Sequence, residues 1–415
     1  MEIVLWAVGG FFLLKLVEGG GKLVMFAVGS LWIASNFIVL TTQYAFNPNP
    51  VLLLTPAFIY SLKKYLELKR LIFSFFTFLL SGLFFNFEMN AAVFIPIIIF
   101  FSILLTGKID LMKTRNFWMG VIVYIILLSP QLLFDLKHDF IMSKSVLRYL
   151  SEGGMEQEVN PLKRIPFIAE KFFNVAVPTF MNREFFTKLT VVLFFVSSYF
   201  FLRRKEWKKD VTIPVTLFYI LVPFFGYVLV PTTVNSWHLG GVVAAIILLF
   251  GLRFLGKLPT FILSIFIIYF ALVNINNYFR ERGSPSTDPS LYANEVAAID
   301  YVYEKAQGKN FKVYIYLPSV YDYPYQYLFW WYGNKKYGYI PGEYVYSPNK
   351  PKYIASQDKF QGIKTNFSGL VFLIKEPDRI GMRTAWENDF KDMEFISKEM
   401  IGPIEIEIRK EANTL

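Results

Sequence analysis

Glu88 stands alone between two strongly apolar runs, in the short segment NFEMN. An ionisable group held at a membrane boundary is costly, so a residue of this kind is a functional candidate by default. We therefore take Glu88 as the candidate catalytic carboxylate, which would pair with a cation or act as a base. The alternative interpretation is an exposed loop carboxylate.

The most specific cluster of polar residues directly follows another apolar run, in the segment PQLLFDLKHDF. Lys137 and His138 are placed where cations can hold a lipid phosphate, and Asp135 is placed to orient them. An interfacial anchor that carries no chemistry is the alternative.

Two uncharged segments complete the set of candidates. A proline-containing turn holds Asn47 and Asn49, whose amides can donate to and accept from a sugar or the backbone. Trp237 and His238 stand at the mouth of a later apolar run. With Asp135, these four residues form the predicted sugar and acceptor cavity. A rigid helix-entry turn and a hydrogen-bonded histidine anchor are the alternatives.

The composition says what kind of protein must position these residues. Of 415 residues, 54% are hydrophobic and only 18% are charged, against about 25% charged in soluble domains. The absence of Cys excludes disulfides, thiolate nucleophiles and iron–sulfur clusters, and two His leave little for a histidine-built metal site. The net charge of +10 has a topological explanation in a membrane protein, so we predict no nucleic-acid partner.

The apolar runs predict a polytopic α-helical membrane protein with about ten spans. Turns that carry Lys and Arg alternate with short turns that carry neither, which makes the basic turns cytoplasmic. The chain is then an integral protein of the cytoplasmic membrane, with residue 1 and everything after about residue 280 outside. The runs lie at 3–17, 23–41, 49–62, 71–85, 91–107, 117–134, 188–202, 212–230, 238–253 and 258–275.

This pattern divides the chain into four parts: N-terminal membrane helices at 1–134, an external loop at 135–187, C-terminal membrane helices at 188–279 and an extracytoplasmic α/β domain at 280–415. The external loop has apolar and basic residues at helical spacing in 141–150 and 162–175, which predicts interfacial helices. The last part has predicted strands at 312–318, 370–375 and 404–410, a helix starting at Asp288-Pro289 and a helical stretch at 383–392.

Three segments carry a resemblance to a known family: FNPNP at 46–50, GLFFNFEMNAAVFIP at 82–96, and SPQLLFDLKHDFIMSKSVLRYL at 129–150. With the membrane-plus-external layout, they make the chain similar to the polyprenyl-phosphate-sugar-dependent membrane glycosyltransferases of the GT-C fold. The closest resemblance is to the dolichyl-phosphate-mannose protein mannosyltransferase-like group, glycosyltransferase family 39.

The resemblance implies inverting transfer of a sugar from a polyprenyl-phosphate donor to a lipid, glycan or protein acceptor at the external face. A carboxylate would act as the base, and cations would stabilise the departing lipid phosphate. Lys137, His138, Arg148 and Arg164 are the candidates for the phosphate. The family's acidic motif in the first external loop is missing here, so the N-terminal spans are expected to be absent, and Glu88 is the substitute carboxylate.

Two other functions remain open at this point: a non-catalytic membrane subunit whose external domain binds a glycan or a partner, and a lipid transporter or flippase. A transporter predicts charges at mid-membrane, whereas the polar residues here cluster at the boundary. No metal site and no cofactor are assigned beyond the polyprenyl-phosphate sugar substrate, and a requirement for a divalent metal stays open.

Overall fold

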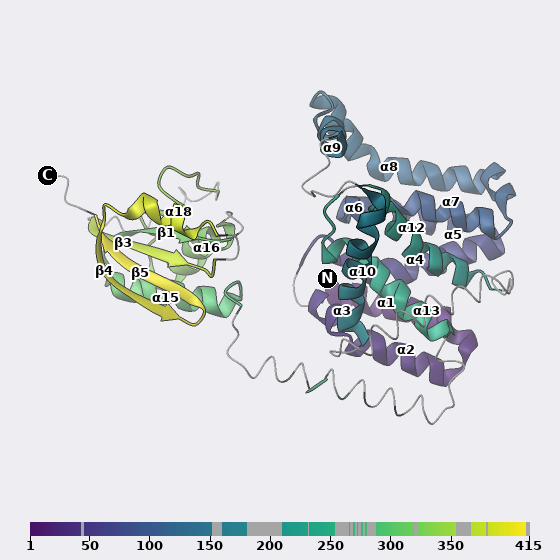
Figure 1. The fold of residues 1–415 in the computed structure, drawn as a ribbon, viewed down its shortest axis with the longest axis horizontal. Helices are drawn as coiled ribbons and strands as arrows, with labels where there is room; N and C mark the ends of the chain where they lie inside the picture. Colours follow the sequence, from purple (N-terminus) through teal and green to yellow (C-terminus); the bar gives the residue numbers. More distant parts are fainter. Residues whose placement is uncertain are drawn as a thin grey trace. The chain divides into compact units, whose positions relative to one another are not determined.

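The structure is a computed structural model in which the chain forms two compact units, Met1–Tyr278 and Phe279–Leu415 (Figure 1). Each unit is described by itself. The residues that the structure describes are 1–42, 45–151, 160–180, 210–230, 232–253, 265, 269, 272, 275–276, 279, 288–318, 322–353, 367–378 and 381–411.

The first unit is built of helices around one apolar core. Its α-helices are α1 (Glu2–Val17), α2 (Lys22–Ala34), α3 (Asn36–Thr41), α4 (Asn49–Leu68), α5 (Leu71–Phe87), α6 (Met89–Ala92), α7 (Ile95–Leu105), α8 (Arg115–Lys137), α9 (Ile141–Ser151), α10 (Pro161–Phe180), α12 (Thr212–Leu229) and α13 (Gly240–Arg253). Short 3-10 turns are η1 (Glu18–Gly20), η2 (Ile109–Lys113) and η4 (Ser236–Leu239).

The prediction of about ten spans in a GT-C-like arrangement is wrong. Within the described residues, three helices are long and apolar enough to cross a membrane: Glu2–Gly20, Arg115–Lys137 and Thr212–Leu229. The expected span 188–202 lies outside the described residues, and 258–275 is described only at isolated positions.

The other apolar runs form helices that are too short or too polar. The run 23–41 is broken at Ser35, whose extended backbone (φ −66°, ψ 117°) separates α2 from α3. Helix α7 has 11 residues and is about 16 Å long, well below the ~30 Å hydrocarbon thickness of a bilayer. Helix α4 has 20 residues, but its last third carries Lys63, Lys64 and Glu67. Hydropathy therefore identified apolar helices but not their lengths.

Helices α5 and α8 lie side by side and run in the same direction. Ser74 near the start of α5 donates its hydroxyl to the Asn116 carbonyl (2.6 Å), and Asn86 near the end of α5 donates to the Leu127 carbonyl (3.0 Å). A Cβ on Gly120 of α8 would lie 2.2 Å from the Phe78 ring, so glycine is required for this close approach. The beginnings of the two helices therefore form one end of the pair, and Glu88 follows α5 at the other end.

The second unit is a small α/β domain. Its elements are α15 (Tyr292–Ala306), β1 (Asn310–Tyr316), α16 (Tyr323–Leu328), a π-turn η6 (Phe329–Gly333), α17 (Asn334–Tyr337), β2 (Glu343–Val345), β3 (Phe367–Lys375), α18 (Arg383–Glu387), η8 (Asn388–Phe390), β4 (Glu394–Ile401) and β5 (Ile404–Lys410).

The five strands form one mixed sheet in the order β2-β1-β3-β5-β4. Strand β1 is parallel to β2 and β3, whereas β5 is antiparallel to β3 and β4. Helix α15 covers one face of the sheet, and α18 lies on the other (Figure 1). The strands expected at 312–318, 370–375 and 404–410 correspond to β1, β3 and β5. The helix expected to start at Asp288-Pro289 instead starts at Tyr292, because Asp288 caps a separate turn through Ser290.

Glu295 in the first turn of α15 gives this unit a testable pH dependence. Burial, together with the nearby charges of Glu376 and Asp288, raises the pKa of Glu295 to about 7. The folded unit therefore holds a proton that the unfolded chain releases between about pH 4.5 and pH 7, so stability falls as pH rises through this window. Because glutamine does not titrate, we expect Glu295→Gln to remove this loss in the free energy of unfolding, which amounts to about 3 kcal/mol above pH 7.

The measurement is hydrogen exchange of amides in 288–411 within the full chain, at pH 5 and pH 8, corrected for intrinsic exchange. The matched control is Glu304→Gln, which changes an exposed carboxylate on the same helix. Glu304→Gln should keep the pH dependence of the parent chain. If Glu295→Gln kept it as well, this account of Glu295 would be wrong.

Candidate functional site

Glu88 and His238 come together from distant parts of the first unit. Glu88 lies between α5 and α6, and its Oε1 accepts the backbone N–H of Asn90 (3.1 Å), which caps α6. His238 lies in η4, and its Nε2 is 3.9 Å from Oε1 of Glu88 and 3.3 Å from Nδ2 of Asn90. The His238 side chain is only 7% exposed and the Glu88 side chain 11%, so the pair is largely shielded from solvent.

The hydrogen bonds of the His238 ring orient it toward Glu88. The backbone N–H of Asn235 donates to Nδ1 (3.3 Å), so Nδ1 acts as an acceptor. Nε2 is the atom that faces Glu88 and Asn90. The Tyr227 hydroxyl donates to the Asn90 carbonyl (2.9 Å), which ties the segment after Glu88 to α12. The arrangement places the Glu88 carboxylate beside an imidazole, with the Asn90 N–H as its hydrogen-bond donor.

Aromatic rings stand beside this pair. The Trp237 ring packs edge-on against His238 with centroids 5.6 Å apart, and against Phe46 with centroids 5.7 Å apart. The Trp237 and Phe46 side chains are both partly exposed, and Asn47, next to Phe46, is exposed as well. An exposed aromatic face next to a buried carboxylate is suited to a ligand that has both an apolar ring face and hydroxyl groups.

Two of the predicted site residues hold the backbone instead. The buried Asn49 donates its amide to the Thr41 carbonyl (2.8 Å), which closes the turn before α4. Arg164 of α10 is 1% exposed and donates to the carbonyls of Tyr227 (2.9 Å), Val230 and Thr232 (both 3.2 Å). The last carbonyls of a helix have no partner within it, so Arg164 satisfies the end of α12.

The cluster at the end of α8 forms a turn of its own. Asp135 accepts hydrogen bonds from the backbone of Met142 (2.7 Å) and from the backbone and hydroxyl of Ser143, which fixes the start of α9. The His138 ring stacks on Phe134 with centroids 4.1 Å apart. The side chains of Lys137, His138 and Arg148 are exposed. Among the described residues, the hydrogen bonds and ring contacts of Asp135 and His138 stay within α8, this turn and the start of α9.

Sequence reasoning missed Asn90, Asn235 and Tyr227 as parts of the site. Asn90 lies in the same NFEMN segment as Glu88 and offered a weak signal, since it is a second polar residue between apolar runs. Tyr227 lies inside an apolar helix and gave none.

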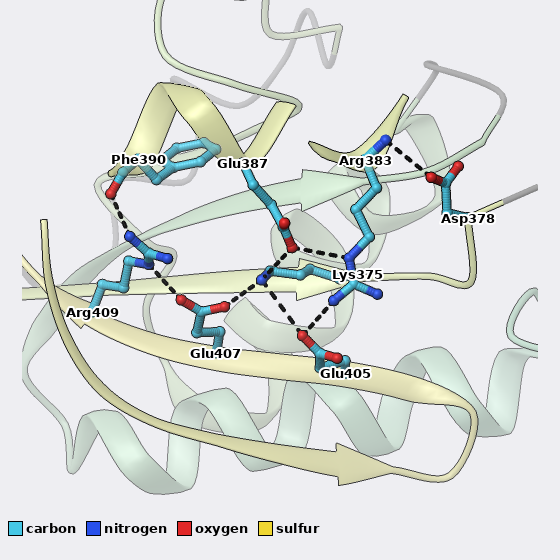
Figure 2. Close-up of polar contacts among 8 residues, drawn as sticks. All are labelled: Lys375, Asp378, Arg383, Glu387, Phe390, Glu405, Glu407 and Arg409. Carbon is cyan, nitrogen blue, oxygen red and sulfur yellow. Dashed lines mark hydrogen bonds and ion pairs between the residues drawn. The ribbon is translucent and has the colours of Figure 1, made fainter. Parts of the chain in front are cut away.

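A second group of charged side chains lies in the C-terminal unit, around Lys375 at the end of β3 (Figure 2). Lys375 is opposite Glu405 in the β3–β5 register, and Glu407 lies two residues further along the same face. The ammonium of Lys375 donates to Glu387 (2.8 Å) and Glu407 and lies 3.5 Å from Glu405. The alternation in IEIEIRK thus puts the isoleucines on the α15 face of the sheet and Glu405, Glu407 and Arg409 on the α18 face.

Two arginines close this group. Arg383 of α18 bonds Glu387 and Glu405, and Arg409 joins Glu407 to the Phe390 carbonyl (Figure 2). Although burial opposes ionisation, the hydrogen bonds from Lys375 and Arg383 hold the pKa of Glu387 below its ordinary value. For Glu405, burial is likewise outweighed by Arg383, and its pKa is also lowered.

Three carboxylates of this group are spaced like metal ligands. In the described residues, Glu387, Glu405 and Glu407 are the one set of three whose oxygen atoms lie within 4.8 Å of one another. Their shared centre is occupied by the Lys375 ammonium, so a metal ion would have to displace a buried lysine. We therefore interpret the group as an ion network that holds α18 to the sheet.

No protein-family model, no curated protein and no solved structure matches this chain. The resemblance to the glycosyltransferase group therefore depends on the short segments at 46–50, 82–96 and 129–150. Any function has to be argued from the geometry of the site itself.

Proposed function

We propose that the chain is an integral membrane glycosyltransferase, which transfers a sugar from a polyprenyl-phosphate-linked donor to a lipid, glycan or protein acceptor. The observation that carries the proposal is the meeting of Glu88 and His238 beside Trp237 and Phe46. This site puts a shielded carboxylate next to aromatic rings at the end of apolar helices.

Placement in the cytoplasmic membrane is supported by α8. It is 23 residues long, and only 11% of its most apolar window is buried within the protein. Large apolar side chains are exposed along its length, including Trp118, Ile122, Ile126 and Leu133. A long helix with so much exposed apolar surface is suited to the hydrocarbon of a membrane, which supports this placement. The basic residues at its start then face the cytoplasm, and the Glu88 end of α5 faces the other side.

The proposed reaction gives Glu88 the role of general base. The acceptor hydroxyl loses its proton to the Glu88 carboxylate as its oxygen bonds to the anomeric carbon, and the bond from that carbon to the phosphate oxygen breaks. The lipid phosphate leaves with the electron pair, so the configuration inverts. The His238 ring lies beside the carboxylate, and Trp237 and Phe46 offer ring faces to the sugar. Lys137, His138 and Arg148 remain the proposed cations for the phosphate.

The test is transfer by the full chain in proteoliposomes, using a panel of radiolabelled polyprenyl-phosphate hexoses and a membrane extract as acceptor. We expect label to leave the donor and appear in acceptor material. In parallel, donor binding should quench the Trp237 fluorescence obtained as the difference between the parent chain and Trp237→Phe. The absence of both donor consumption and quenching with every member of the panel would overturn the proposal.

A further inference from the structure

An apolar cavity of about 230 Å³ lies between α5, α7, η2 and α8. It is lined by Phe78, Ser81, Pro96, Ile99, Phe100, Ile103, Met112, Phe117, Val121 and Tyr124. Ser81 already donates its hydroxyl to the Thr77 carbonyl (2.7 Å), so the lining has little to offer water. A water molecule needs two to four polar partners, which makes an apolar occupant the better fit.

The cavity reaches the basic end of the α5–α8 pair. Its lining residue Met112 directly precedes Lys113 in the sequence. Its lining residue Phe117 comes two residues after Arg115. Arg70 precedes the first residue of α5, and the Asn116 amide donates to the Lys69 carbonyl (2.9 Å), which holds the two helix beginnings together. Four cationic side chains therefore lie at the end of the helix pair that the cavity reaches, and all four are exposed: Lys69, Arg70, Lys113 and Arg115.

Few carboxylates among the described residues balance the charges at this end. Within the described residues, Arg70 and Arg115 have no carboxylate within 4.0 Å, and Lys113 has only Asp110 at 3.9 Å, with both side chains more than 80% exposed. The N-terminus of a helix already carries a partial positive charge, so cations there favour a bound anion. The hydroxyl of the fully buried Tyr65 lies beside Ser74 and Thr114 at the same end.

We propose that this end of the helical unit binds one anionic phospholipid. Its phosphate lies between Arg70 and Arg115, and part of one acyl chain fills the cavity. Adjacent basic and apolar surfaces between membrane helices are the chemistry that recognises such lipids. The proposal shares the membrane placement of α8 with the proposed function but not the sugar chemistry. Glu88 is at the opposite end of α5, which has 17 residues, about 25 Å away.

Native mass spectrometry of the full chain tests this directly, with phosphatidylglycerol and phosphatidylcholine of identical acyl chains added to the detergent-purified protein. We expect one phosphatidylglycerol per chain, preferred about tenfold over phosphatidylcholine. Both lipids carry the phosphate, but the choline ammonium would add a like charge beside the basic side chains, and repulsion between charges a few ångströms apart near a protein surface corresponds to roughly that factor or more. Arg115→Gln should remove the preference. The matched control Lys22→Gln changes an exposed cation at the start of α2 and should retain it.

Cavity filling tests the acyl-chain part. Val121→Phe narrows the cavity and should weaken phosphatidylglycerol binding about tenfold, since burying about two fewer acyl-chain methylenes corresponds to roughly that factor. Ile122→Phe is the control, because Ile122 is exposed on the same helix. Inorganic phosphate at millimolar concentration should not compete.

Several results would overturn the proposal: equal binding of the two lipids, equal effects of Arg115→Gln and Lys22→Gln, unchanged binding by Val121→Phe, or competition by inorganic phosphate. Circular dichroism identifies a misfolded variant, and Arg70→Gln then replaces Arg115→Gln. None of these measurements uses sugar transfer, so a failure here is separate from a failure of the proposed function.

Discussion

Glu88→Gln is expected to abolish sugar transfer while leaving the local structure in place. The glutamine carbonyl can still accept the Asn90 N–H, which Glu88 accepts at 3.1 Å, so α6 keeps its cap. The amide cannot take a proton from an acceptor hydroxyl. Because a positioned general base contributes 10² to 10⁴ in rate, we expect kcat to fall about 10³-fold with the donor KM nearly unchanged.

The measurement is initial-rate transfer in proteoliposomes, and donor quenching of Trp237 fluorescence shows that binding persists. Glu18→Gln is the matched control, since Glu18 is an exposed carboxylate of the same unit that pairs with Lys15. Its activity should equal that of the parent chain. Parent-level activity in Glu88→Gln would remove Glu88 from the reaction, and a parallel loss of donor binding would make its role structural.

The two halves of this site show what sequence reasoning could and could not reach. Glu88 and His238 were each identifiable, because a polar residue at the end of an apolar run stands out. The contact between them was not, because the segment of Glu88 and Asn90 is far from His238 in the sequence, Asn90 being 148 residues away, and no short motif joins them. Arg164 shows the opposite error. Its charge suggested a phosphate ligand, but its guanidinium is buried against the carbonyls of α12.

The helical unit departed from expectation because hydropathy measures composition and not continuity. The run at 23–41 is apolar throughout, yet Ser35 takes an extended backbone conformation and its hydroxyl caps the next helix at Ile38. A serine among apolar residues does not reveal such a break, because it can also lie within a helix and bond the carbonyl four residues earlier, as Ser81 does.

In the C-terminal unit, the strands that could be predicted from the sequence are those that are buried inside the sheet. Strands β1, β3 and β5 lie inside the sheet and carry continuous or alternating apolar residues. Strand β4 is at the sheet edge, and nearly every residue of EFISKEMI is exposed, so no apolar pattern marks it. Strand β2 has three residues, too few for any period to appear.

Lys375→Met is expected to lower the free energy of unfolding of the C-terminal unit by about 3 to 5 kcal/mol, the cost of leaving buried charges unpaired. Lys375 is 2% exposed and faces Glu387, Glu405 and Glu407. Methionine preserves most of the apolar stem but removes the ammonium. The three carboxylates would then face one another with only the two flanking arginines to balance them.

Hydrogen exchange of β3 and β5 amides in the full chain measures this free energy. Lys312→Met is the matched control on the neighbouring strand β1. Lys312 is 2.7 Å from Glu411, but their side chains are 30% and 32% exposed, so its loss should cost about 1 kcal/mol or less. If Lys375→Met and Lys312→Met had equal effects, the buried network would contribute no more than a surface ion pair.

A double variant separates unpaired charge from lost packing. In Lys375→Met with Glu407→Gln, one carboxylate leaves together with the ammonium, and Glu387 and Glu405 keep their bonds to Arg383. Neutral replacements of buried ion pairs are often tolerated, so most of the lost stability should return, with a coupling energy above about 1.5 kcal/mol. A double variant as unstable as Lys375→Met would instead mean that the lysine stem, wedged between the sheet and α18, is what holds this face of the domain.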